Sequence, residues 1–279
     1  MTGRLVLCST PIGNLGDASP RLAVTLAEAD LVFAEDTRRA RKLLTALGVE
    51  ATVESFFVGN ERGQSDRLGS LLAQGAIVAL ITDAGTPSVS DPGSVAVAAA
   101  RRVGAEVAVV PGPSAVTAAV AVSGLVDGPF VFGGFLGRKG PERAAQLEAL
   151  SEESRPTVLF LSPHRATADF EALAAAGRED RQVCVARELT KLHEEVWWGT
   201  LGEAALRWSE VDPRGEFTVV VAGAPVVTTD PDEALEIART FRAEGLSASQ
   251  AARRAAAETG ADRRAIFDAR VSDASPLGE

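Results

Sequence analysis

The sequence has few of the residues that build disulfide frameworks and metal centres, with two cysteines and two histidines among 279 residues. Cys8 and Cys184 each lie within an apolar run, a pattern that gives neither a disulfide framework nor the spacing of metal ligands. His164 and His193 lie far apart in the sequence, which disfavours a histidine-rich zinc site. We therefore expect no metal at the functional site.

The sequence also lacks long hydrophobic runs and a recognisable leader. No apolar stretch reaches the roughly 18 residues that span a bilayer, and Arg4 leads directly into a strand-like run without a signal-peptide pattern. Hydrophobic residues make up 46% and charged residues 24% of the chain, which excludes disordered, collagen-like and coiled-coil proteins. These features predict a soluble protein of a reducing compartment, the cytoplasm.

Motifs of several common enzyme classes are missing. No Gly-x-Gly-x-x-Gly follows a predicted strand, and no Gly-x-x-x-x-Gly-Lys-Ser/Thr occurs. The Gly-x-Ser-x-Gly elbow, His-Glu-x-x-His and a recognisable Cys/His dyad are missing as well. Ordinary Rossmann dehydrogenases, P-loop NTPases, α/β hydrolases and zincins are thereby disfavoured.

The chain does contain an alternation of short apolar runs and segments with helical periodicity. Ser19 and Pro20 match an N-cap and a first helical position, and further helices are predicted before Gly48, after Asp91 and after Ser114. Strands that alternate with helices indicate an α/β fold with a mostly parallel sheet. In the first half, the predicted strands are 5–8, 31–34, 76–81, 106–110 and 130–132.

The second half repeats the α/β pattern with wider spacing. Thr200 and Glu203 match a capping box, and a stretch rich in Gly, Pro and basic residues at 133–142 is interpreted as the interdomain connection. The predicted strands are 157–161, 182–186, 195–198 and 216–222. We therefore predict an N-terminal α/β domain over 1–134, a second α/β domain over 135–229 and a helical C-terminal element over 230–279.

Three polar loops rich in glycine and proline follow predicted strands, beginning at Thr10, Asp83 and Pro111. Ligands of open α/β sheets bind outside the carboxyl ends of the strands. Glycine lets the backbone approach a ligand closely, and proline pre-sets a turn. One such loop would be read as a tight strand-to-helix turn, but three in one domain favour a ligand site.

Several segments, in order along the chain, closely resemble one family. The most specific is Asp83-Ala84-Gly85-Thr86-Pro87 with Ser90-Asp91-Pro92-Gly93. The others are Thr10-Pro11-Ile12-Gly13-Asn14-Leu15-Gly16-Asp17, Ala34-Glu35-Asp36-Thr37-Arg38, Pro111-Gly112-Pro113-Ser114-Ala115, Gly134-Phe135-Leu136, Ser162-Pro163-His164-Arg165, Ala186-Arg187-Glu188-Leu189-Thr190-Lys191 and Gly215-Glu216-Phe217. The chain is similar to the ribosomal RNA small-subunit methyltransferase I family, a branch of the tetrapyrrole-methylase superfamily.

This resemblance implies two α/β domains with the cofactor cleft between them and a small helical C-terminal element. It also implies a homodimer and S-adenosylmethionine-dependent 2′-O-methylation of the ribose of a cytidine in 16S ribosomal RNA. Because the sulfonium of this cofactor is cationic, Asp83 is the candidate for a nearby carboxylate. The other cofactor-binding positions carried over from the family are Pro11, Gly85, Thr86, Val89, Ser114, Ala115 and Leu161.

Two departures from the family pattern limit the transfer of catalytic roles. Gly59 stands where the family usually has the histidine of His-Asn-Glu, and Leu161 stands where it usually has the glutamate of Glu-Ser-Pro-His-Arg. A base that removes the hydroxyl proton is still needed. The candidates are Asp36, Glu61, Glu188 and Lys191, the lysine only if burial lowers its pKa. Each could instead be a helix cap, an ion-pair partner or a surface residue, and Glu188 and Lys191 could simply pair with each other.

The formal net charge of −10 argues only weakly against nucleic acid, because exposed charges are screened and local patches decide. The Arg-rich C-terminal helices resemble the family's RNA-contacting element, although any such cluster can be a solvated face. The basic residues that we expect to contact RNA are Arg38, Arg138, Lys139, Arg165 and Arg187.

Two other functions fit parts of the pattern. A methylase of a tetrapyrrole or other small substrate would keep the fold and the cofactor but would not need the basic clusters. A catalytically silent RNA-binding protein of ribosome assembly is allowed by Gly59 and Leu161, but it would not need the cofactor loops. Thermal stabilisation of the protein by S-adenosylmethionine separates an enzyme from a silent binder.

Overall fold

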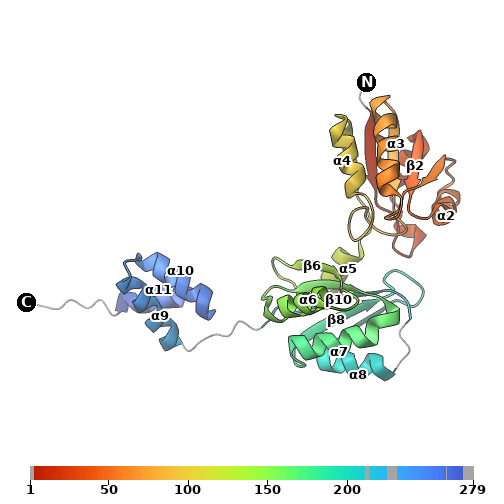
Figure 1. Ribbon diagram of the computed structural model, residues 1–279. Helices are drawn as coiled ribbons and strands as arrows, with labels where there is room; N and C mark the ends of the chain where they lie inside the picture. Colours follow the sequence, from red (N-terminus) through yellow and green to blue (C-terminus); the bar gives the residue numbers. More distant parts are fainter. Residues whose placement is uncertain (1–2, 211–213, 225–230, 262, 273–279) are drawn as a thin grey trace, which may run out of the picture. The chain divides into compact units, whose positions relative to one another are not determined.

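A computed structural model describes residues 3–210, 214–224, 231–261 and 263–272. The chain divides into two compact units, residues 1–223 and 224–279. The larger unit holds two five-stranded sheets, and the smaller one holds the helices of the C-terminal element (Figure 1). None of the described helices is long and apolar enough to cross a membrane.

The first sheet is parallel throughout and has the strand order β3-β2-β4-β1-β5. Its central strands read as continuous apolar runs, as is typical of strands covered on both faces. The strands are β1 (Arg4–Cys8), β2 (Leu31–Ala34), β3 (Val53–Ser55), β4 (Ile77–Ile81) and β5 (Glu106–Val110). Phe33 and Leu80 face one side of the sheet, and Val32 and Ile81 face the other.

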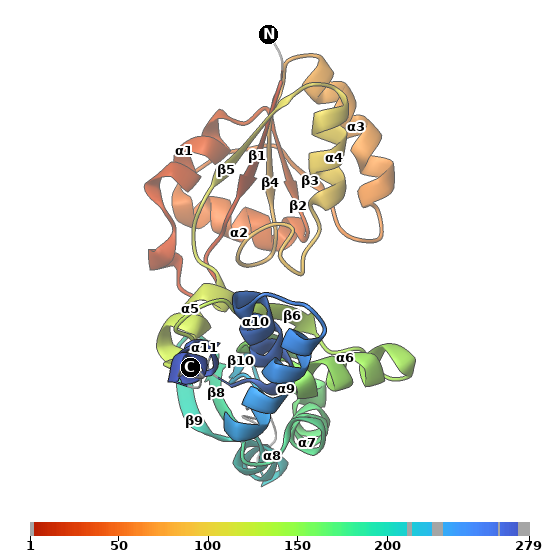
Figure 2. The same ribbon diagram turned by 90° about the vertical axis from the view of Figure 1, so that its left-hand side faces the viewer.

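Helices cover both faces of this sheet (Figure 2). Leu22, Leu26 and Leu44 pack from α1 and α2 on one face, whereas Leu68 and Leu72 pack from α3 on the other, together with α4. Ser19 caps α1 by accepting a hydrogen bond from the Leu22 amide at 3.2 Å, as its N-cap pattern predicts. The elements are η1 (Leu15–Asp17), α1 (Pro20–Glu28), α2 (Thr37–Leu47), α3 (Glu61–Ala73) and α4 (Ser94–Arg102).

The second sheet is mixed, with the strand order β6-β7-β10-β8-β9. Only the β6–β7 pair is parallel, and the other three pairs are antiparallel. Its strands are β6 (Val131–Phe135), β7 (Thr157–Leu161), β8 (Gln182–Arg187), β9 (Glu195–Thr200) and β10 (Phe217–Val221). The strand expected at 130–132 is therefore β6, and it belongs to this sheet instead of closing the first one.

The two faces of the second sheet are covered by helices from different parts of the chain. On one face lies α5 (Ala115–Ser123), whose Val116 and Ala119 contact Cys184 and Val220. The other face carries α6 (Pro141–Glu152), η2 (Pro163–Arg165), α7 (Ala166–Gly177) and α8 (Leu201–Glu210). Thus α5 follows the last strand of the first sheet but packs on the second, which brings the loop after β5 to the second sheet.

The smaller unit consists of α9 (Pro231–Ala243), α10 (Ala248–Thr259) and α11 (Arg263–Ser272). Their shared core includes Phe241 and Ile266, which pack among alanines. Ser247 and Gln250 form a capping box at the start of α10. The predicted boundaries after 134 and after 229 stay predictions, and residues 230, 262 and 273–279 of the predicted C-terminal element lie outside the described residues.

Candidate active site

A cavity of about 350 Å³ lies between the two sheets of the larger unit. Loops after β1, β4 and β5 form one wall, and β6, β7, β8 and β10 contribute the other. Its volume falls within the range of about 300–1,000 Å³ that is usual for small-molecule and cofactor sites. The carboxyl ends of the first sheet therefore open onto a ligand-sized space, as the positions of the three loops predict.

The loops after β1 and β4 hold each other at this cavity. Thr10 and Gly85 exchange backbone hydrogen bonds of 2.9 and 3.1 Å, and Ser9 Oγ lies 3.0 Å from Thr86 Oγ1. Gly85 has a φ of 76°, a conformation that glycine adopts without steric cost. These contacts fix the backbone of this wall before any ligand arrives.

The loop from Thr86 to Gly93 contains backbone strain. Ser88 and Ser90 have φ values of 72° and 61°, which are uncommon for residues with a Cβ. The Ser88 amide donates a hydrogen bond to the Pro92 carbonyl at 3.2 Å, which closes the loop on itself. Strain of this kind persists where the surrounding structure enforces it, and it clusters at functional sites.

Apolar groups dominate the opposite wall. Phe160 lies between two aromatic neighbours, with ring centroids 5.1 Å from Phe132 and 5.4 Å from Phe135. Phe160, Phe135 and Phe217 line the cavity, while hydroxyl groups of Thr86 and Ser114 come from the loop side. A wall of this composition suits a ligand that carries both a flat heteroaromatic part and polar groups.

Two of the described lining residues, Asp91 and Glu216, carry a side chain that ionises to an anion, and none is lysine, arginine or histidine. Burial raises the pKa of Asp91 to about 6, with a further contribution from the nearby carboxylates of Glu35 and Asp83, against a hydrogen bond with Thr82. Burial also raises the pKa of Glu35. The cavity therefore favours a neutral or cationic ligand group near Asp91.

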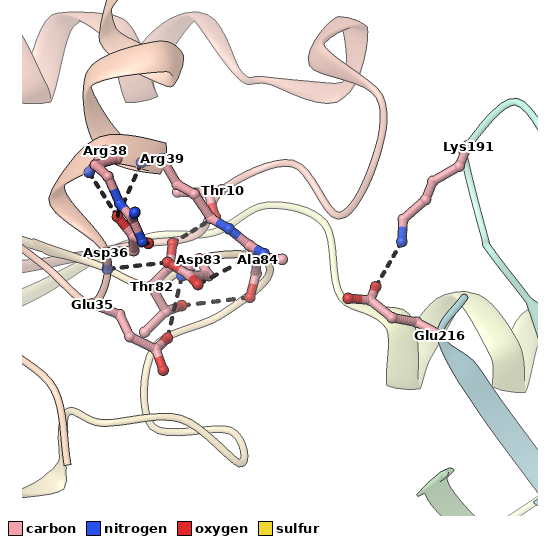
Figure 3. A network of polar contacts seen from close by, with 10 residues as sticks. All are labelled: Thr10, Glu35, Asp36, Arg38, Arg39, Thr82, Asp83, Ala84, Lys191 and Glu216. Carbon is pink, nitrogen blue, oxygen red and sulfur yellow. Dashed lines mark hydrogen bonds and ion pairs between the residues drawn. The ribbon is translucent and has the colours of Figure 1, made fainter. Parts of the chain in front are cut away.

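Six of the eight residues predicted to bind the cofactor line this cavity, namely Gly85, Thr86, Val89, Ser114, Ala115 and Leu161. The other two, Pro11 and Asp83, line a neighbouring hollow of about 240 Å³ that is formed with α2. Asp83 is engaged there: it accepts a hydrogen bond from the Asp36 amide at 3.1 Å and lies 3.3 Å from Arg39 Nη1. The structure thus brings most of the predicted cofactor residues together but directs Asp83 to a network of its own (Figure 3).

The four candidates for the catalytic base lie outside the described lining of the cavity. Asp36 is the N-cap of α2 and accepts hydrogen bonds from the Arg38 amide and guanidinium. These bonds lower the pKa of Asp36 to about 2, which makes it a weak base. Glu61 lies in the first turn of α3. Both residues therefore have a structural place that accounts for them.

Glu188 and Lys191 form one cluster with Glu216, which does line the cavity. Lys191 Nζ lies 2.7 Å from Glu188 Oε1 and 2.8 Å from Glu216 Oε2. Burial alone would lower the pKa of Lys191, but its bonds to the two carboxylates raise it. Burial would raise the pKa of Glu188, and the bonds from Lys191 and from the Glu216 amide lower it. Lys191 is therefore held as a cation, so the lowered pKa that a base would require does not occur.

The residues expected to contact RNA fall into two groups. Arg38, Arg138 and Lys139 are exposed. In contrast, Arg165 donates to the Leu136 and Gly137 carbonyls at 3.0 and 3.2 Å, and Arg187 lies 3.3 Å from Glu195 Oε2. Arg165 and Arg187 thus hold the second domain together, and the exposed group is the one placed to meet a partner.

Sequence reasoning did not assign roles to Asp91 and Glu216, the two ionisable residues of the cavity wall. Both stand within segments that carry the family resemblance, Ser90-Asp91-Pro92-Gly93 and Gly215-Glu216-Phe217. Asp91 was expected to open a helix, but α4 begins at Ser94 and leaves Asp91 in the strained loop. Among the described residues, no group of three His, Cys, Asp or Glu side chains is placed to hold a metal ion.

Comparisons with known proteins agree with this architecture. The family model of tetrapyrrole (corrin/porphyrin) methylases matches residues 4–205. Diphthine synthase superposes with a TM-score of 0.61 at 19% identity, covering 78% of this chain and 89% of that one. The native form of uroporphyrin III C-methyltransferase from Thermus thermophilus superposes with a TM-score of 0.58 at 19% identity, covering 79% and 97%. These structures share the fold.

Relatives with higher sequence identity cover nearly the whole chain. The ribosomal RNA small subunit methyltransferase I of Synechocystis is 41% identical over 268 residues, covering 95% of this chain and 96% of the relative. The protein of the same name from Mycobacterium tuberculosis is 44% identical over 271 residues, covering 96% and 94%. Since identity at this level extends over both sheets and into the C-terminal helices, the chain belongs to the tetrapyrrole methylase family, in its ribosomal RNA small subunit methyltransferase I group.

Proposed function

We propose that this protein methylates the 2′-hydroxyl of a cytidine ribose in 16S ribosomal RNA and takes the methyl group from S-adenosylmethionine. The observation that carries the proposal is the cavity between the two sheets, where Gly85, Thr86 and Ser114 from the loops meet Leu161 of β7. The relatives named as ribosomal RNA small subunit methyltransferases support the choice of substrate over a tetrapyrrole.

The cavity fits this cofactor in chemistry as well as in size. Phe160 and Phe217 offer an apolar wall for a purine ring, and the backbone of Gly85 is open to close approach. Ser114 and Thr86 give the loop side of the cavity a polar character that suits the polar part of the ligand. The anionic side chains of the wall suit a cation, and S-adenosylmethionine, when bound, supplies an electrophilic methyl group on a cationic sulfur.

The main contribution of the chain to catalysis is then positioning. In-line displacement at a methyl group needs the acceptor oxygen aligned, and holding two reactants in register is worth roughly 7–11 kcal/mol of the barrier. The paired loops at Thr10 and Gly85 supply a rigid wall for this purpose. The loop that the hydrogen bond between the Ser88 amide and the Pro92 carbonyl closes gives the cavity a second rigid part of its wall.

Of the four candidates, Asp36 has a lowered pKa and Lys191 is held as a cation, which leaves Glu61 and Glu188 for the removal of the hydroxyl proton. Glu188 has the strongest claim, because it shares Lys191 with the cavity residue Glu216 and keeps an anionic carboxylate. A correctly placed base contributes about 10²–10⁴-fold to such a step. Glu188→Gln should therefore slow methyl transfer by that order while cofactor affinity is retained.

The exposed arginine and lysine residues give the proposed RNA surface. Arg38 at the start of α2 and Arg138 with Lys139 before α6 are exposed, as are Arg253 and Arg263 of the smaller unit. Contacts to phosphates supply affinity without reading sequence. With a ribosomal subunit as substrate, the protein would act in the cytoplasm.

We also propose that the protein is a homodimer. Trp198 on the edge strand β9 is 54% exposed, and its indole donates a hydrogen bond to the Ser123 carbonyl at 3.0 Å. The neighbouring Val122 is 41% exposed. An exposed aromatic group on an edge strand with an exposed aliphatic group of the adjoining helix is typical of a surface that another chain covers. Light scattering of the purified protein, with Trp198→Lys as the variant, tests this proposal.

A methyl-transfer assay tests the proposed reaction. Small ribosomal subunits from cells that lack this protein would be incubated with it and with tritiated S-adenosylmethionine. We expect label at one cytidine, with the modified linkage resistant to alkali, because a 2′-O-methyl group blocks cleavage. Clear cofactor binding without transfer to RNA would refute the RNA substrate and favour a small-molecule acceptor.

A further inference from the structure

The two carboxylates of the cavity wall differ in their partners. Glu216 Oε2 lies 2.8 Å from Lys191 Nζ, so its charge is met by a cation of the protein. Asp91 is surrounded differently: the groups that act on it are Thr82, Glu35 and Asp83. Within the described part of the chain, no lysine, arginine or histidine pairs with Asp91.

An ionised Asp91 is therefore expensive while the cavity holds no cation. Burial disfavours its charge, and Glu35 and Asp83 repel it. Arg39, whose charge acts on Glu35, is paired with Asp83 at 3.3 Å. A cationic ligand atom beside Asp91 would remove this cost, which makes the position selective for positive charge.

The backbone holds Asp91 in this position at some cost. It follows Ser90, which has a positive φ, and precedes Pro92, whose carbonyl is bonded to the Ser88 amide. Gly93 has a φ of 152°, and a Cβ at this position would collide with Ser88 Oγ. The loop is therefore fixed in a conformation that other residues at Gly93 would not allow, and Asp91 lines the cavity as a result.

We propose that the Asp91 carboxylate is the counter-ion of the cationic sulfur of the methyl donor, and that this contact lets the protein distinguish donor from spent product. The inference rests on the proposed use of S-adenosylmethionine. In this role Asp91 replaces Asp83, which the sequence suggested and which is instead bonded to Asp36 and Arg39. When the methyl group leaves, the sulfur becomes neutral and the contact loses its attraction, so product release is favoured.

Calorimetric binding of two ligands tests this assignment without any activity measurement. S-adenosylmethionine and S-adenosylhomocysteine share the adenosine, ammonium and carboxylate groups but differ in the charge on sulfur. For Asp91→Asn we expect the affinity for S-adenosylmethionine to fall about 10- to 100-fold, the usual range for a contact to a charged group, with little change for S-adenosylhomocysteine. The matched variant Glu216→Gln removes the other carboxylate of the wall and should leave the ratio of the two affinities unchanged.

Other outcomes would overturn the proposal. If Asp91→Asn weakens the binding of both ligands equally, the carboxylate contacts the ammonium that the two ligands share. If both affinities stay unchanged, the Asp91 carboxylate is not part of the binding site. If Asp91→Asn fails to fold, the wild-type protein gives the same answer. Its preference for S-adenosylmethionine should decline as the pH falls through about 6, where Asp91 becomes protonated, and a constant ratio would refute the contact. A wild-type protein that binds neither ligand would refute the proposed function itself.

Discussion

The ammonium of Lys191 lies 2.7 Å from a carboxylate oxygen of Glu188, and it reaches a second carboxylate, Glu216, at 2.8 Å. The Glu216 amide in turn donates to Glu188 Oε1 at 2.9 Å. The turn that follows β8 is thereby tied to the start of β10, at the edge of the cavity. Lys191 thus acts as the cation that keeps two carboxylates together.

Lys191→Met should destabilise the protein, because it leaves Glu188 and Glu216 facing each other without their shared cation. Lys191 and Glu188 side chains are 26% and 18% exposed, so solvent replaces the lost contact only in part. We expect a loss of about 1–3 kcal/mol in the free energy of unfolding, measured by urea denaturation.

Arg4→Met provides the matched control for Lys191→Met. Arg4 pairs with Glu106 at 3.2 Å, but the two side chains are 48% and 61% exposed. Exposed pairs of this kind are worth about 0–1 kcal/mol. Equal losses in the two variants would mean that the Lys191 cluster contributes no more than an ordinary surface ion pair.

Arg165→Ala should act mainly on the free energy of unfolding and only secondarily on RNA binding. The guanidinium donates to the Leu136 and Gly137 carbonyls and lies 3.8 Å from the buried Asp169. Gly137 and Asp169 keep Arg143 as a partner, but the carbonyl of the buried Leu136 loses its donor, at a cost of about 1–3 kcal/mol in the free energy of unfolding. Arg138→Ala, on an exposed side chain, should leave the unfolding midpoint nearly unchanged. An Arg165 variant of wild-type stability that binds RNA poorly would reverse the two roles.

Asp91→Asn should change how stability depends on pH in the protein without cofactor. Burial raises the pKa of Asp91 from its ordinary value of 3.8 to about 6 in the folded chain, so the folded state binds this proton more tightly. The contribution of Asp91 to stability is therefore full below about pH 4 and is lost as the pH rises through about 6. Urea denaturation at a series of pH values should show that the free energy of unfolding of the variant rises relative to that of the wild type as the pH increases across this range.

Asp36→Asn offers a control of opposite sign. Bonds from Arg38 lower the pKa of Asp36 from its ordinary value of 3.8 to about 2, so the contribution of Asp36 to stability is present above about pH 4 and is lost as the pH falls. Asparagine still caps a helix. If both variants show the same slope with pH, the burial of Asp91 does not govern its titration.

The strands of both sheets were largely predictable from the sequence, but the pairing within the second sheet was not. β2 spans Leu31–Ala34 as predicted, because strands covered on both faces are short apolar runs between turn residues. β3 has three residues, too few for a periodic pattern. The strand expected at 130–132 was grouped with the first half of the chain, whereas β6 pairs with β7 (Thr157–Leu161), because local pattern does not encode pairing. The stretch 133–142, interpreted as the interdomain connection, instead contains the end of β6 and the start of α6.

The position of the cavity was predictable from the sequence, but the side chains that line it were predictable only in part. Loops after β1, β4 and β5 converge because carboxyl ends of parallel strands meet at one edge, so Gly85 and Ser114 could be placed there. Asp83 and Asp91 belong to the same sequence segment, and nothing in the pattern tells which of them faces the cavity. That choice depends on the positive φ values of Ser88 and Ser90 and on the contact of Asp83 with Arg39, which are tertiary features.

The exposed basic pair before α6, Arg138 and Lys139, should contribute a salt-dependent part of the affinity for RNA. Arg138 and Lys139 are exposed, so neutral replacements should leave the fold intact. If each contacts a phosphate, Arg138→Ala with Lys139→Ala should weaken binding to ribosomal RNA and lower the slope of log affinity against log salt by about 1 to 2. Arg67→Ala is the control, since Arg67 is paired with Glu54 at 2.7 Å through Nε. An unchanged slope in the double variant, with the control also unchanged, would move the RNA surface away from this loop and toward α2 or the C-terminal helices.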